Sequence, residues 1–170
     1  MWFPKCGSRG HPEGFELSAG KAWVNDPDDG AVLAVDLDRG RQVARWPTGF
    51  HRLNFPMAQA RDGAEVSIAF RLPAALARID TASGKTLSTL GTCGDADDLF
   101  VVGERTLVVC GEGYVDIVEG GKSVARVTTR GGARTGLYVP ALGSLFLALP
   151  SRGGRPAEIW GLRLTGAAAR

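Results

Sequence analysis

The side chains that could carry chemistry lie in short loops between apolar segments, in four successive regions of the chain. These regions alternate between mostly acidic and mostly basic sets. Charges of both signs that converge on a concave rim could bind a small polar or zwitterionic ligand, a peptide or a partner loop. The alternative is that they form ion pairs and turn hydrogen bonds that only support the fold. The candidate ligand-binding residues are His11, Glu13, Arg52, Asn54, Asp95, Asp97, Asp98, Glu112, Arg134 and Arg155.

Three of these residues are also candidates for a metal site. Glu13, Asn54 and Asp98 each lie near the start of a successive strand group, and their oxygen atoms suit Ca²⁺ or another divalent ion. Such an ion could polarise an ester carbonyl or activate water. The DADD segment at 95–98 lacks the glycine and the final glutamate of a calcium-binding loop, so its spacing is not diagnostic.

Other familiar catalytic arrangements find no support in the sequence. The chain has two histidines, and neither has the spacing of a metal-binding pair. It also lacks the G-x-S-x-G motif of a serine nucleophile. We therefore expect no catalytic residue and no cofactor.

Three cysteines leave at least one thiol unpaired within the chain. If Val102 pairs with Arg105 in a hairpin, Cys110 comes to lie opposite Asp97 and near the residues that follow Cys93. We predict that Cys93 and Cys110 lie close enough for a disulfide, which would form in an oxidising compartment. The alternative is two partly buried thiols.

The segments that must position these residues repeat along the chain. Residues 79–90, IDTASGKTLSTL, repeat the pattern of residues 35–46, VDLDRGRQVARW: an apolar residue and Asp, then Gly and a base, then an alternating tail. A third copy lies at 116–127 and a degenerate fourth at 160–166. Strand-like runs precede the copies in two sets, FELS, FPMAQ, DLFVV and TGLYV, and then KAWVN, EVSIAF, TLVVC and SLFLAL.

A repeat of about 40 residues with four short strands is typical of a β-propeller blade. We expect an all-β fold, one β-propeller domain over residues 1–170 with about four four-stranded antiparallel blades, either a half-propeller or a small closed ring. The blades are expected near 11–49, 52–92, 95–130 and 133–166, with residues 1–6 as a possible closing strand. The large apolar residues expected between blades are Trp23, Phe70, Phe100, Phe146 and Trp160.

The segment AWVN at 22–25, followed by the D-x-x-x-G-[RK] turn, resembles the YVTN-type β-propeller repeat of the bacterial YncE-like group. The resemblance extends to HPEGFEL, LNFPMA, CGDADDLF, CGEG and GGARTGLYVP, about four blades of a longer propeller. The resemblance implies a binding or scaffold protein that is periplasmic or secreted. It implies no particular reaction, because the members of the group do not share one. Members usually have an export signal and about seven blades, and this sequence shows neither.

Composition narrows the class of partner. A net charge of +2 argues against nucleic acid or an anionic membrane surface. No apolar run reaches the roughly 20 residues of a membrane helix. We expect a non-catalytic propeller that binds an unknown polar ligand or protein through its charged loops, with pairing of two copies to complete a larger ring. The alternatives are a divalent-metal-dependent hydrolase of the propeller-lactonase type and a non-functional remnant of a longer family member.

Overall fold

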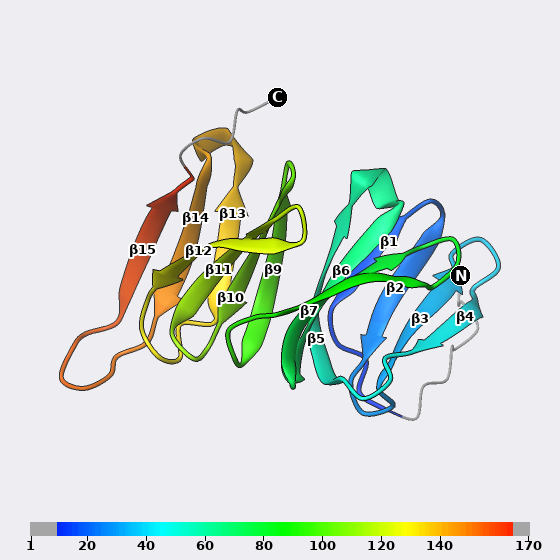
Figure 1. Cartoon of the computed structure of the whole chain (residues 1–170), viewed down its shortest axis with the longest axis horizontal. Helices are drawn as coiled ribbons and strands as arrows, with labels where there is room; N and C mark the ends of the chain where they lie inside the picture. The colour runs from blue at the N-terminus through cyan, green and yellow to red at the C-terminus, as the bar shows by residue number, and fades with distance from the viewer. Residues whose placement is uncertain (1–9, 165–170) are drawn as a thin grey trace. The chain divides into compact units, whose positions relative to one another are not determined.

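The computed structural model describes residues 10–164, apart from the side chain of Arg61, and is built from four antiparallel β-sheets (Figure 1). The expected all-β fold of propeller-like sheets is confirmed. The chain divides into two compact units, Met1–Gly91 and Thr92–Arg170, and each contains two of the sheets. No helix in the described part of the chain is long and apolar enough to cross a membrane.

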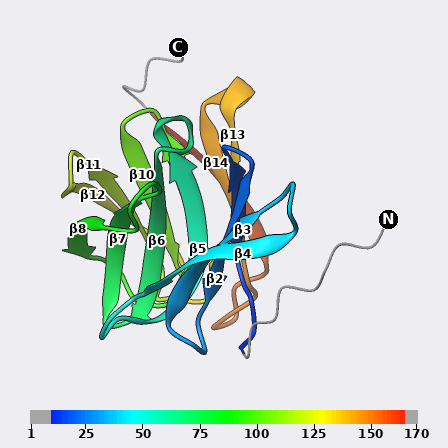
Figure 2. The same cartoon turned by 90° about the vertical axis from the view of Figure 1, so that its right-hand side faces the viewer.

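Both sheets of the first unit have four strands that follow one another in sequence order (Figure 2). The first sheet contains β1 (Phe15–Ser18), β2 (Lys21–Asp26), β3 (Ala31–Asp36) and β4 (Arg41–Pro47). The second contains β5 (Arg52–Ala60), β6 (Glu65–Leu72), β7 (Ala74–Asp80) and β8 (Thr86–Gly91). Strands β1 and β2 contact β5, so the two sheets pack face to face.

The second unit has one four-stranded and one three-stranded sheet in its described part. The third sheet contains β9 (Ala96–Val102), β10 (Arg105–Cys110), β11 (Tyr114–Glu119) and β12 (Lys122–Thr128). The fourth contains β13 (Thr135–Val139), β14 (Ser144–Leu149) and β15 (Glu158–Arg163). The proposed closing strand, residues 1–6, lies outside the described residues.

The apolar core of each unit lies between its two sheets, because alternate side chains of every strand point to the same face. In the first unit, Trp23 and Phe70 are each only 2% exposed, and Trp23 stacks on Trp46 at 5.1 Å between ring centroids. In the second unit, the largest fully buried core side chains are Leu107, Leu145, Leu147 and Leu149.

The large apolar residues of the second unit follow the prediction with one exception. Phe100 and Trp160 pack against the core as expected. The prediction for Phe146 was wrong, because this residue alternates with the buried Leu145 and Leu147 and so lies on the opposite face of β14. It was chosen for size, whereas the alternation of the strand decides the face.

The repeated Asp and Gly that reveal the period form the same turn twice. Asp36 Oδ1 accepts a hydrogen bond of 2.8 Å from the Arg39 backbone N–H, and Asp80 Oδ1 accepts one of 2.8 Å from Ser83 N–H. The following residues Gly40 and Gly84 have left-handed φ values of 60° and 73°, which glycine adopts without strain. The repeat therefore has a structural cause at these positions.

Candidate functional site

The predicted site residues fall into two groups, one in each compact unit. Four of them lie in the first unit and six in the second, and the structure is described separately for each group. The first group is His11, Glu13, Arg52 and Asn54. The second group is Asp95, Asp97, Asp98, Glu112, Arg134 and Arg155.

An ion pair between Asp95 and Arg134 lies at the loop end of the second unit. Arg134 Nη2 is 2.9 Å from Asp95 Oδ2, and the two side chains are 43% and 34% exposed. Both lie against Gly111, where an added Cβ would sit 2.1 Å from Asp95 Oδ2 and 3.2 Å from Arg134 Nε. Any larger residue at 111 would therefore displace the pair.

Backbone hydrogen bonds fix the two loops that carry this pair. Gly111 N–H donates to the Asp95 carbonyl at 2.7 Å, and Glu112 N–H donates to the Gly94 carbonyl at 3.3 Å. The Glu112 carboxylate in turn accepts a bond of 2.7 Å from Gly94 N–H. One carboxylate oxygen of Glu112 thus holds the loop that leads into β9.

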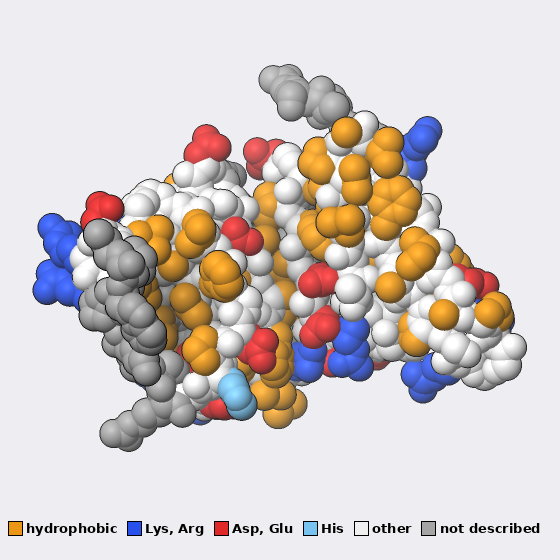
Figure 3. Space-filling model, turned by 180° about the vertical axis from the view of Figure 1, so that it is seen from behind, with side chains coloured by type: hydrophobic (Ala, Val, Ile, Leu, Met, Phe, Trp, Pro, Cys, Tyr) orange, Lys and Arg blue, Asp and Glu red, His pale blue; other side chains and the backbone are white. Residues whose placement is uncertain are grey.

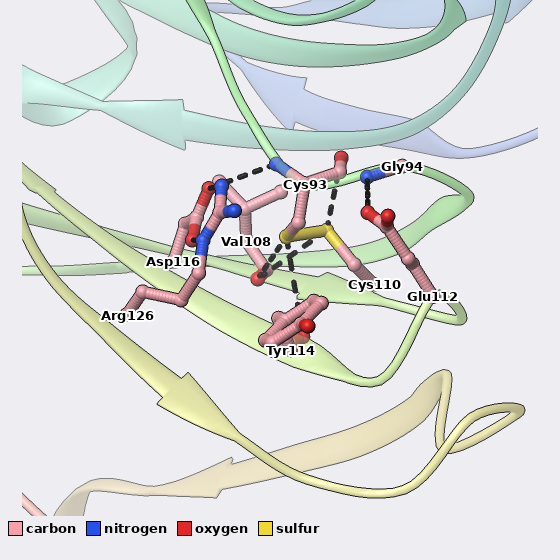
Figure 4. A network of polar contacts seen from close by, with 8 residues as sticks. All are labelled: Cys93, Gly94, Val108, Cys110, Glu112, Tyr114, Asp116 and Arg126. Atoms are coloured by element: carbon pink, nitrogen blue, oxygen red, sulfur yellow. Dashed lines mark hydrogen bonds and ion pairs between the residues drawn. A yellow bond between two sulfur atoms is a disulfide. The ribbon is translucent and has the colours of Figure 1, made fainter.

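A disulfide joins the same two loops (Figure 4). Cys93 and Cys110 have sulfur atoms 2.00 Å apart and Cα atoms 5.9 Å apart, and the residues are 1% and 0% exposed. The expected register was off by one residue: Cys110 lies opposite Ala96 and not Asp97, because the β9–β10 pairing shifts between Val109 and Cys110. A β-bulge of this kind adds one unpaired residue to a strand.

Beside the disulfide lies a buried carboxylate that the sequence analysis did not select. Asp116 is 1% exposed, accepts the Cys93 N–H at 2.8 Å, and bonds Arg126 at 2.6 and 2.8 Å (Figure 4). The signal was present in the sequence, since Asp116 is a charged residue within the apolar run of β11. Asp116 holds the loop in place and does not face a ligand site, because its hydrogen bonds go to Cys93 and Arg126 of the same chain.

Asp98 connects the two sheets of the second unit. Its Oδ2 accepts a 2.6 Å hydrogen bond from Gly136 N–H at the start of the fourth sheet. Burial raises the pKa of Asp98 above its usual value, and the charge of Asp97 adds to the rise. This hydrogen bond joins the two sheets in addition to the apolar core between them.

Basic residues hold the long loop between β14 and β15. Arg130 has an 8% exposed side chain and donates to the carbonyls of Pro150 and Pro156 and to the Glu158 carboxylate. Arg155 is exposed in that loop and pairs through its backbone with Arg152. Arg130 is thus a structural residue at the edge of the candidate site.

In the first unit, Asn54 connects the two sheets in the way that Asp98 does in the second. Asn54 is fully buried, and its Nδ2 donates to Asn25 Oδ1 and to the Ala31 carbonyl, both at 3.0 Å. Asn25 Nδ2 donates in return to the carbonyls of Phe55 and Pro56. The Asn54 Nδ2 group is therefore committed to the fold, whereas its Oδ1 is buried and has no hydrogen-bond partner in the described part of the chain.

The remaining candidates of the first unit lie at its surface. Glu13 is exposed, and its backbone N–H donates to the Asn25 carbonyl at 2.9 Å. His11 Nδ1 is 3.8 Å from Asp28 Oδ2, with the histidine side chain 91% exposed. In residues 10–164, no group of three or more His, Cys, Asp or Glu side chains is arranged to hold a metal ion.

Known structures share this fold. The chain is similar to hydrazine synthase of Kuenenia stuttgartiensis, with a TM-score of 0.76 and 14% identity, over 89% of this chain and 46% of that one. It is also similar to the dihydro-heme d1 dehydrogenase NirN in complex with DHE, with a TM-score of 0.72 and 12% identity, over 95% and 37% of the two chains. Both contain β-propellers, and this chain spans less than half the length of either.

At such identities, the similarity establishes the propeller-type fold alone. No protein-family model matches the sequence, and no curated protein matches it either.

Proposed function

We propose that this chain is a non-catalytic, ligand-binding part of a β-propeller, and that it binds a small zwitterionic ligand at the Asp95–Arg134 pair. The observation behind this proposal is that several contacts hold a partly exposed ion pair in place. A surface ion pair contributes little to stability. Here, however, a disulfide, two backbone hydrogen bonds and a close contact with Gly111 hold the pair in place. Fixed charges of both signs reduce the ordering cost of binding a zwitterion.

Thermal melting with defined probes tests this proposal. We expect glycine, glutamate or the dipeptide Gly-Gly to raise the melting temperature, because a ligand that binds only the folded chain stabilises it by about 2.7 kcal/mol at 100 times its Kd. The shift should vanish in Asp95→Asn and in Arg134→Gln. Arg39→Gln is the matched control, because Arg39 forms a surface ion pair with Asp36 in a turn of the first sheet.

Two results would contradict the proposal. One is an unchanged melting temperature with every probe, and the other is an equal shift in the wild-type chain and both variants. Addition of Ca²⁺ or Zn²⁺ in place of the probes tests the alternative of a metal-dependent hydrolase. A rise in melting temperature that is lost in Glu13→Gln, Asn54→Ala or Asp98→Asn would favour that alternative.

We also propose that the chain belongs to the YVTN-type, YncE-like group and acts outside the cytoplasm. The AWVN segment and the repeated Asp–Gly turn support the first inference, and the Cys93–Cys110 disulfide supports the second, since such bonds persist in oxidising compartments. Alkylation of free thiols in intact cells, followed by mass spectrometry, tests the location. Alkylated Cys93 and Cys110 would place the protein in a reducing compartment and overturn this part.

A further inference from the structure

Exposed apolar side chains gather at one loop end of the second sheet. Phe50 is 74% exposed, Leu72 is 62% exposed and Leu53 is 38% exposed. Phe50 lies between β4 and β5, Leu53 lies near the start of β5, and Leu72 ends β6. Together with His51 and Arg52 they form what we call the apolar-basic patch. Apolar side chains are also visible elsewhere on the surface (Figure 3), so exposure alone does not identify a site.

Strand pairing and ring contacts join Phe50, His51, Arg52 and Leu72 of the patch to their neighbours and to the core. Arg52 and Leu72 are direct partners in the β5–β6 pairing, so their side chains are neighbours on one face. The His51 ring lies 4.1 Å from the Phe50 ring and 4.9 Å from the ring of Phe70, which is 2% exposed. A buried ring thus supports His51, which supports Phe50, so less side-chain freedom is lost when a partner binds.

The patch carries positive charge without acidic residues of its own. Residues 48–54 and 71–74 include two arginines and one histidine but no Asp or Glu. The Arg52 side chain is exposed and has no hydrogen-bond or ion-pair partner among the described residues, while its guanidinium lies against Gly30. Arg71 lies over the Phe55 ring at 4.1 Å. Arg52 is therefore available to an outside carboxylate.

The acidic turn next to Gly30 does not neutralise Arg52. Asp28 lies 3.8 Å from His11, and Asp29 lies 3.8 Å from Arg45. These carboxylates face other cations of the first sheet. The charge at the patch therefore favours an acidic partner over a basic one.

Leu53, beside Arg52 at the start of β5, has a strained backbone conformation. Its φ of 60° is left-handed, a region that disfavours leucine and that Asn, Asp or Gly adopts more readily. Asp95 takes the same conformation, with φ of 58°, where the third sheet begins. An apolar side chain at a position better suited to Asn indicates a role other than stability.

We propose that the apolar-basic patch docks a peptide segment of a partner protein in which an apolar side chain lies beside a carboxylate. The apolar side chain packs on Phe50 and Leu72, and the carboxylate pairs with Arg52. Aromatic and arginine side chains commonly supply most of the binding energy at such interfaces. Like the proposed function, this inference assigns binding to loops at the ends of strands. It involves none of the residues around Asp95 and Arg134.

Short labelled peptides of defined composition test this. The probe has Phe-Leu at its centre with Asp and Glu on either side; one control peptide replaces the acids by Lys, and another replaces Phe and Leu by Ala. Binding is measured by fluorescence anisotropy and located by amide shifts of the ¹⁵N-labelled chain. We expect only the acidic Phe-Leu peptide to bind, with shifts at Phe50, Arg52 and Leu72.

Variants separate recognition from folding. Phe50→Ala should weaken peptide binding by about tenfold, and Arg52→Gln should remove the preference for the acidic peptide over the Lys peptide. Leu53→Asn should weaken binding while it preserves or raises the melting temperature, because it relieves strain. Leu87→Ala, which shortens a 46% exposed side chain on β8, is the matched control and should change neither peptide binding nor the melting temperature. Asp95→Asn should leave peptide binding intact, so failure here is distinct from failure of the zwitterion site.

Four outcomes would overturn the proposal. The first is no amide shift at the patch at millimolar peptide. The second is equal binding of the acidic and Lys peptides. The third is Phe50-dependent co-sedimentation with vesicles of phosphatidylcholine and phosphatidylglycerol without peptide binding, which would indicate a lipid surface. The fourth is self-association that Phe50→Ala abolishes, which would indicate a second copy of the chain.

Discussion

Asn54 and Asp98 show how single polar residues hold neighbouring sheets together. Each lies beside a register shift in the first strand of its sheet, and each hydrogen-bonds across to another sheet of the same unit. A buried polar group is costly unless it has such a partner. These bonds use the Asn54 Nδ2 group and the Asp98 Oδ2 atom, whereas the Asn54 Oδ1 atom stays buried without a hydrogen-bond partner among the described residues.

Asp98→Asn should stabilise the protein at neutral pH. The pKa of Asp98 is raised in the folded chain, chiefly by burial, so the charged form costs stability above that pKa. As the pH falls through the folded pKa towards the usual value, the carboxyl becomes neutral and the cost disappears. Asn keeps an oxygen that can accept the Gly136 N–H but carries no charge. Urea unfolding should therefore show a more stable variant at neutral pH and nearly equal chains at about pH 4.

Asp116→Asn is the control, and its effect should have the opposite sign. Asp116 is buried and bonds Arg126 twice, so loss of its charge should destabilise the chain by about 1–3 kcal/mol at neutral pH. The account of Asp98 would be wrong if Asp98→Asn were destabilising by an amount that does not shrink on acidification.

At the scale of strands, the sequence predicts much because alternation and turn residues are local. The runs KAWVN, EVSIAF, TLVVC and SLFLAL each lie in the second strand of a sheet, namely β2, β6, β10 and β14. What the sequence did not reveal depends on contacts between distant residues. The bulge that sets Cys110 opposite Ala96 and the place of Phe146 on the sheet face opposite the core are of this kind.

The candidate site was predictable only as a set of residue types. Loop position identified Asp95 and Arg134, but their pairing over Gly111 requires the bulge and the loop hydrogen bonds. Phe50 and Leu72 were not selected, since an apolar residue in a strand-rich sequence gives no sign that it stays exposed.

The Cys93–Cys110 bond should contribute substantially to the stability of the second unit. It closes a loop with a sequence separation of 17 residues, for which the loss of chain entropy in the unfolded state corresponds to about 3 kcal/mol. We expect Cys93→Ser with Cys110→Ser to lower the free energy of unfolding by roughly this amount. Guanidinium unfolding with and without reductant measures it, and reductant should not affect the double variant.

Thiol counting tests the bond itself. Two of the three cysteines form the disulfide, which leaves one free thiol per chain under denaturing, non-reducing conditions. Three reactive thiols would show that the bond is absent from the protein as purified.

At the scale of the whole molecule, the fourth sheet leaves a face and an edge that a second chain could cover. Leu137 and Ile159 are 61% and 69% exposed on the face opposite the core. Leu164 N–H donates to the Gly143 carbonyl, so alternate residues of β15 bond to β14. The backbone groups of Ile159, Gly161 and Arg163 therefore point to the other edge, which no strand of the described chain pairs with. Such edges promote association.

We therefore predict a homodimer that buries more than ~1,000 Å² and includes this face. Ile159→Lys should shift the protein to a single-chain mass without lowering the melting temperature, because the substituted side chain is solvent-exposed within one chain. Leu37→Lys, at a 42% exposed position in a turn of the first sheet, is the matched control and should leave the mass unchanged. Light scattering at micromolar concentration gives the masses. A wild-type chain that is monodisperse at the mass of one copy would contradict the dimer. Soluble aggregates would instead favour a remnant of a longer propeller, because its unpaired sheet faces would associate without a fixed partner.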